Sequence, residues 1–214
     1  MWARGAAIRP VPRYAVLDAA ALDRVERELA SDADDASEAR PGAPHVDLDD
    51  AFGRFEATQP QLAERVAIVL GRPLDETALA LGYFLCIAIW LAFERTFARR
   101  LGEVTADALR ATEDALALEE EIRASHAEEP IDLEDVVAQE QPAILAFVHS
   151  HLEAALDAAT NGHADKADTA GVDVDDVHLV YRTVLVLILA LSHAVAADDQ
   201  PGGSPANGSQ EILA

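Results

Sequence analysis

The chain has 214 residues, half of them apolar, which is enough for one domain or two small fused domains with a sizeable core. Its 39 acidic residues against 16 basic ones give a formal net charge of -23, which disfavours direct binding to nucleic acid and suits a basic protein partner. The single cysteine excludes an internal disulfide, and the opening residues lack the apolar run of a secretory signal, so we expect a cytoplasmic protein.

Residues 1–14 predict an extended basic arm. Pro10 and Pro12 remove backbone donors and favour extended chain, and the arm carries charge opposite to that of the body. We favour a tether that lies on the protein's own acidic surface over an arm that binds a partner. Residues 9–16 are the one strand candidate in the sequence.

The segment 15–101 predicts four helices. Apolar residues recur at helical spacing in each, and residues that favour helix starts precede them. The predicted helices are 18–30 after the cap Asp18, 47–57 after Asp47, 60–71 opened by Pro60, and 75–101 after Asp75.

The middle of the last of these helices, Ala78–Phe93, has no charged side chain and no polar face. Such a helix must be surrounded by protein or by lipid. The run is shorter than the about 20 apolar residues that span a bilayer, and the arginines that follow suit the negative end of a helix dipole. We therefore predict a buried core helix and no membrane span, with membrane association as the minority interpretation.

Residues 103–129 form the most regular segment of the chain. Apolar residues there recur at alternating steps of three and four, which predicts a buried heptad seam; they are Leu101, Val104, Ala108, Ala111, Ala115, Leu118 and Ile122. Acidic residues spaced by seven line a flank turned away from this seam, at Asp107, Asp114, Glu121 and Glu128. We interpret them first as a solvated acidic side, and second as a surface that binds a partner.

The second half of the chain repeats the order of the first. A short helix at 133–137 precedes a helix opened by Gln141-Pro142, and a mostly apolar helix follows at 177–197. Gln59-Pro60 opens a helix at the corresponding place in the first half. We infer an internal duplication, with units 15–101 and 103–197 forming one compact domain around two central apolar helices that pack on each other.

Few residues are candidates for a chemical site. Phosphate-binding loops, nucleophile motifs and paired cysteines are absent from the sequence, so we expect no cofactor. His149 and Glu153, four apart on a predicted helix, are a weak metal-binding pair, for which a solvated pair is the favoured interpretation. The tail 198–214 reads as a flexible linker, and Ile212 and Leu213 near its end are weak candidates for docking to a partner.

These patterns predict an all-α helical bundle, and we favour a binding protein over an enzyme. The favoured function is a non-enzymatic acidic interaction module, an adaptor, chaperone-like partner or inhibitor of a basic protein. One alternative is a bundle that binds a small molecule or a metal between its central helices, with enzyme activity included. The other is an acidic mimic of nucleic acid that binds a basic protein. The sequence leaves the oligomeric state open.

Overall fold

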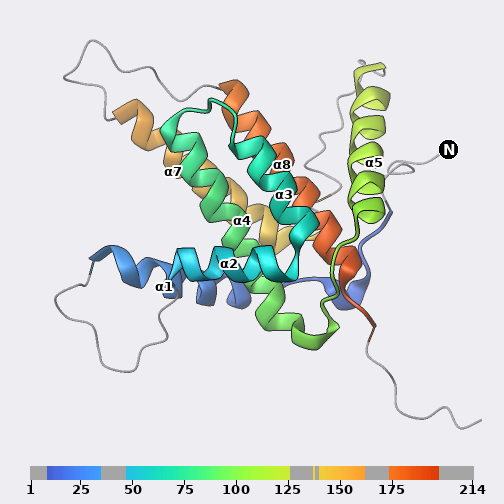
Figure 1. The fold of residues 1–214 in the computed structure, drawn as a ribbon. Helices are drawn as coiled ribbons and strands as arrows, with labels where there is room; N and C mark the ends of the chain where they lie inside the picture. Colours follow the sequence, from blue (N-terminus) through green and yellow to red (C-terminus); the bar gives the residue numbers. More distant parts are fainter. Residues whose placement is uncertain (1–8, 35–46, 126–136, 138–139, 162–173, 198–214) are drawn as a thin grey trace, which may run out of the picture.

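The structure, a computed structural model, describes residues 9–34, 47–125, 137, 140–161 and 174–197. Within these ranges the chain is all-helical, as the sequence predicts. The α-helices, drawn in Figure 1, are α1 (Ala19–Asp34), α2 (Leu48–Thr58), α3 (Pro60–Leu70), α4 (Glu76–Phe97), α5 (Ala106–Ser125), α7 (Pro142–Asn161) and α8 (Val174–Ala194). Short 3-10 turns occupy Arg13–Ala15 and Ala98–Arg100.

The helices begin where the sequence has capping residues. Asp18 Oδ1 accepts a hydrogen bond from Ala21 N at 2.8 Å, and Asp75 Oδ1 accepts one from Ala78 N at 2.8 Å. The central helix α4 ends earlier than predicted, because the chain turns at Ala98, which has a positive φ of 44°.

The strand candidate at residues 9–16 is wrong. Arg13–Ala15 form a 3-10 turn, and the two prolines before them cannot donate to a strand ladder. The one β-bridge in the described ranges joins Leu101 to Val195, antiparallel. Because Val195 takes part in this bridge, α8 ends at Ala194 and not at the predicted residue 197.

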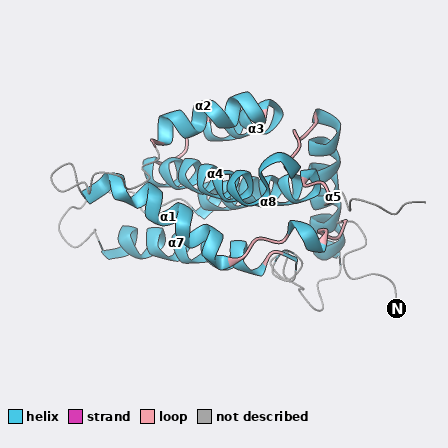
Figure 2. Cartoon of the chain, turned by 90° about the horizontal axis from the view of Figure 1, so that it is seen from below, coloured by secondary structure: helices cyan, strands magenta, loops and turns pink. Residues whose placement is uncertain are grey.

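The helices form three layers, with one further helix across an end. Figure 2 shows α4 and α8 in the middle, α2 and α3 on one side, and α1 and α7 on the other. The helix α5 stands at the edge of the bundle, where it packs against α8 and, less extensively, against α3.

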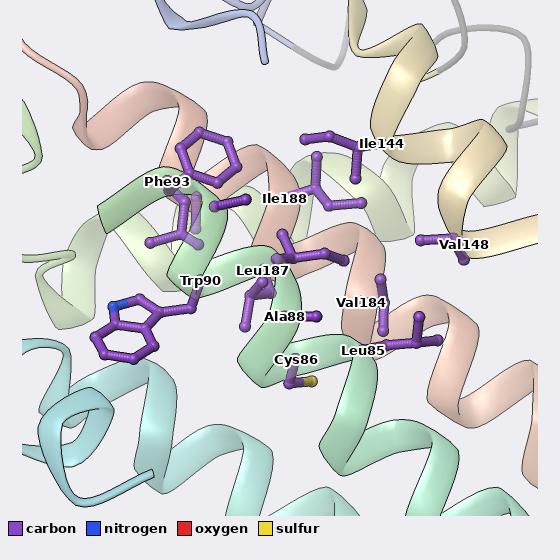
Figure 3. Close-up of a cluster of buried hydrophobic side chains, with 14 of the residues drawn as sticks. Leu85, Cys86, Ala88, Trp90, Phe93, Ile144, Val148, Val184, Leu187 and Ile188 are labelled. Atoms are coloured by element: carbon purple, nitrogen blue, oxygen red, sulfur yellow. The ribbon is translucent and has the colours of Figure 1, made fainter. Parts of the chain in front are cut away.

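The two apolar helices α4 and α8 pack directly on each other, as predicted, and make the most extensive helix contact in the described chain. Figure 3 shows Leu85 and Ala88 of α4 close to Val184, Leu187 and Ile188 of α8. All five side chains are buried. Their removal from water is the main stabilising contribution of this interface.

Gly82 lies where α4 approaches its neighbours most closely. A Cβ atom at this position would lie 2.7 Å from a methyl carbon of Leu70 in α3 and 3.3 Å from one of Val180 in α8. The glycine therefore allows the close approach that the sequence suggests, and it serves two contacts at once.

Both central helices are also long and apolar enough, by length and composition alone, to cross a membrane. The shortness of the uncharged run is therefore not sufficient to exclude a span. Core helices of soluble proteins pass the same test, and 61% of the tested window in α4 and 67% of that in α8 are buried inside the structure.

Two buried glutamines hold the backbone that leads into the outer helices. Gln59, which precedes α3, donates from Nε2 to Gly102 O at 2.9 Å and accepts at Oε1 from Val104 N at 2.9 Å. These bonds fix the extended residues before α5. A buried amide with all of these bonds made is stabilising, and the backbone groups that it satisfies are otherwise without a helix partner.

Gln141, which precedes α7, makes the same pair of bonds at the start of α1. Its Nε2 donates to Ala15 O at 2.8 Å, and its Oε1 accepts from Leu17 N at 3.0 Å. The Nε2 group also donates to Ser192 Oγ at 2.8 Å. Each glutamine thus holds the outer helix of the other half of the chain, and we call the two arrangements the glutamine brackets.

Counted from the two brackets, α1 and α5 match at several positions. Asp18 caps α1 and Thr105 caps α5. Each of these two helices also carries an acid that forms an ion pair with the helix opened by proline in the other half of the chain, α7 for α1 and α3 for α5. Leu22 corresponds to Leu109 and Leu29 to Leu116, and all four leucines are buried. Glu26 corresponds to Glu113. Glu26 forms an ion pair with His151 at 3.3 Å, and Glu113 forms one with Arg65.

Candidate functional site

The surface of α5 is fixed in place by its first turn and its leucines. The bracket of Gln59 holds Val104, and Thr105 Oγ1 accepts from Ala108 N at 3.2 Å as an N-terminal cap. Leu109 and Leu116 are the apolar residues by which the helix packs on α8 and α3. The side of α5 that faces away from these leucines is therefore presented to solvent.

Beyond Val104, which is buried, the predicted heptad seam is wrong as a buried face. Ala108 and Ala111 are exposed, Ala115 is half-buried, and the side chain of Leu118 is 49% exposed. The leucines take the buried side because a leucine removes more apolar area from water than an alanine does. The alanines do share one side of α5, as their spacing predicts, but that side is not covered in the described structure.

The alanine side of α5 forms one wall of a groove, and α8 forms the other. The groove has a volume of about 370 Å³. Its walls are built mainly from small side chains: Ala108, Ala111, Thr112 and Ala115 from α5, with Leu189, Ala190, His193 and Ala194 from α8. We call it the α5–α8 groove.

One end of the groove is formed by the extended chain before α1. His193 Nε2 lies 3.1 Å from Arg9 O and 3.3 Å from Pro10 O. Because carbonyl oxygens only accept hydrogen bonds, Nε2 carries the proton here. Arg9 and Glu103 complete this end of the lining. The described start of the basic arm thus lies against α8, and the tether interpretation of residues 1–14 stays a prediction.

The candidate acidic residues of α5 lie outside the lining of the groove, and Asp114 instead lines a cavity between α3, α5 and α8. Asp107, Asp114 and Glu121 are all exposed, and the Asp107 side chain is 93% exposed. Arg110 lies 3.6 Å from Asp107 at a surface where such a pair contributes little. Glu128 lies outside the described residues. The three described acids therefore form an exposed row, which we call the acidic row.

A second cavity, of about 250 Å³, lies between α3, α5 and α8. Three of the chain's basic residues line it, Arg65, Arg72 and Arg182. Arg65 pairs with Glu113, and Arg182 Nε lies 3.0 Å from Glu120 Oε1. The sequence gives no sign of this cluster, because the arginines come from different helices and follow no common spacing.

The two residues of the predicted metal-binding pair both lie on α7. His149 Nε2 lies 3.5 Å from the hydroxyl of Tyr181, and Glu153 is exposed one turn further along α7. In the part of the chain that the structure describes, no three side chains of metal-ligand type come together. The pair stays a prediction, as do Ile212 and Leu213, which lie outside the described residues.

Comparison of the chain with known protein families, with curated proteins and with solved structures finds no match.

Proposed function

We propose that the chain is a non-enzymatic, acidic helical interaction module that binds a basic protein, as an adaptor, a chaperone-like partner or an inhibitor. The observation that carries this proposal is the acidic row of α5. It stands on a helix at the edge of the bundle, and the net charge of -23 adds long-range attraction for a basic protein.

The test compares two triple variants with the same change in net charge. Binding of small basic proteins and of neutral proteins of the same size is measured by calorimetry at low and at physiological salt. We expect binding of the basic set alone, and about tenfold weaker binding when the acidic row is neutralised. The first variant is Asp107→Asn, Asp114→Asn, Glu121→Gln, and the matched control is Asp23→Asn, Glu56→Gln, Asp157→Asn, at exposed positions elsewhere.

The control should bind nearly as well as the unchanged chain, because the attraction is local to α5. Equal weakening in both variants would mean that the acidic row contributes only through the net charge of the chain and is not the binding surface. If basic proteins bind no better than neutral ones, the proposed function is wrong.

We propose further that the module is cytoplasmic and does not span a membrane. The burial of α4 and α8 by other helices supports this, since a lipid-facing helix would present its apolar surface outward. The expected result is full recovery from cells without detergent and weak binding to anionic vesicles. Retention in the membrane fraction after a carbonate wash would contradict it.

The internal duplication also remains a proposal, with the units 15–101 and 103–197. It is supported by the glutamine brackets and by the matching positions of α1 and α5. The two central helices would then be equivalent members of one pair, and the acidic row would be a feature of one copy only.

The alternative of a small-molecule-binding bundle has one observation in its favour, the second cavity with Arg65, Arg72 and Arg182. Guanidinium groups are suited to carboxylates and phosphates, so the ligand would be a small anion. Thermal shifts with inorganic phosphate and with dicarboxylates, repeated on Arg72→Gln, test this. Metal analysis of the untagged protein tests the metal form of the same alternative. Binding of basic proteins that resists moderate salt would favour the nucleic-acid mimic.

A further inference from the structure

We infer that the α5–α8 groove is the docking site for one helix of the basic partner, with small or apolar side chains in the groove and lysine or arginine beside them. This inference rests on the proposed function and deepens it. It names the surface and the form of the partner, whereas the acidic row alone requires only positive charge.

The matching helix α1 indicates that the groove is a special feature of the α5 side. Counted from the brackets, the positions of Ala111 and Ala115 correspond to Arg24 and Glu28 in α1. Glu28 forms an ion pair with Arg95 of α4, so that large side chains stand between α1 and its central helix. On the α5 side the corresponding residues are alanines, and a groove of about 370 Å³ is present.

The form of the groove suits a helix. Its α5 wall runs from Thr105 to Ala115, about 15 Å or three turns at the rise of an α-helix. The alanines lie at steps of three and four, which is the spacing at which two helices interlock. Small side chains allow the axes to approach to about 8 Å. Leu118 continues the same side of α5 and remains 49% exposed.

The charges around the groove select a basic partner. In the lining itself Glu103 is offset by Arg9, so the preference for a basic partner comes from the exposed Asp107 on the same helix and from the net charge of -23. A second copy of the chain fits poorly, because it would bring one acidic row against another at a net charge of -23 each. Charge complementarity therefore assigns the groove to a different, basic protein.

The test uses two synthetic peptides of identical composition. The first, the seam peptide, is a helix of about three heptads with alanine and leucine at the seam positions and lysine or arginine at the flanking positions. The second has the same residues in scrambled order, so that its charge is equal and its seam is absent. We expect the unchanged chain to bind the seam peptide about tenfold more tightly at about 0.15 M salt.

A pair of alanine variants then locates the binding. Ala111→Trp fills the groove, and Ala146→Trp places the same side chain at an exposed alanine of α7. We expect Ala111→Trp to remove the preference for the seam peptide while binding of the scrambled peptide is unchanged. Ala146→Trp should change neither. Amide chemical shifts between Thr105 and Leu118 should move when the seam peptide is added to the unchanged chain.

The outcomes separate this inference from the function on which it rests. If both peptides bind equally and Ala111→Trp has no effect, the groove inference fails and the acidic module stands. If neither peptide nor any basic protein binds, both fail. A dimer of the chain that Ala111→Trp dissociates in sedimentation would assign the groove to a second copy, and would overturn the inference as well.

Discussion

The α1 side and the α5 side of the bundle are held by the same contacts and differ in what stands between the outer helix and its central helix. On the α1 side, Glu28 and Arg95 form an ion pair there. On the α5 side, alanines line an open groove. Residues that build the fold, such as the bracket glutamines and the buried leucines, are alike on the two sides. Residues that differ between the sides are not required by the fold, so they are the better candidates for a functional surface.

The largest effect is expected from the central pair, which both sides share. Leu85→Asp or Leu187→Asp places a carboxylate in the interface of α4 and α8, where both leucines are buried. An unpaired buried charge and the lost packing should together cost about 4 to 5 kcal/mol, a large part of the stability of an ordinary domain. Urea unfolding measures this. Ile68→Asp, at a position 56% exposed, is the control and should melt almost normally.

The next effect tests whether the brackets are equivalent. Gln59→Met and Gln141→Met keep the side-chain size but remove the partners of backbone groups that are buried except at Gly102, at about 2 to 4 kcal/mol each. The loss should be larger for Gln141, because its amide also donates to Ser192. Chemical denaturation of both variants gives the comparison. A cost below about 0.5 kcal/mol at either site would show that its bracket contributes little.

The ion pair of the α1 side can be removed to make that side resemble the other. Glu28→Ala should cost about 1 to 2 kcal/mol, because Arg95, whose side chain is only 28% exposed, loses its partner. The reverse change, Ala115→Glu, adds an acid without a matching arginine and should cost less than about 1 kcal/mol. Thermal unfolding of the two variants measures the difference. Equal costs would mean that the two sides tolerate the same side chains.

The smallest effect is expected in the groove itself. Ala111→Trp should change stability by less than about 0.5 kcal/mol, as should Ala146→Trp, because both alanines are exposed. A strongly destabilised Ala111→Trp, against a normal Ala146→Trp, would mean that the groove closes in the folded protein. The α5 side would then no longer differ from the α1 side by an open groove.

Much of the fold follows from local chemistry in the sequence. Asp18, Asp47 and Asp75 were identifiable as caps, and Pro60 as the first residue of a helix, because these residues satisfy or remove the unpaired N–H groups of a helix start. The direct packing of α4 on α8 follows equally, since neither has a polar side. These are properties of single helices, which periodicity describes well.

The candidate site was harder to predict because it depends on which side of α5 packs. Spacing identifies residues that share a side, and both Ala108 with Ala115 and Leu109 with Leu116 satisfy a seven-residue repeat. The larger apolar area of leucine decides between them. The repeated Gln-Pro sequence was visible, but nothing in it reveals that each glutamine side chain bonds to the opposite half of the chain.

The burial of Cys86 gives the protein an internal reporter of its own opening. Burial raises the pKa of this thiol from 9.0 to about 12, so the folded chain keeps the proton where an unfolded chain loses it. Between these values the unfolded state binds fewer protons, and this contribution to stability falls as the pH rises above about 9. At lower pH, the sole cysteine should react with a disulfide reagent only when α4 leaves the core, and the labelling rate then follows unfolding.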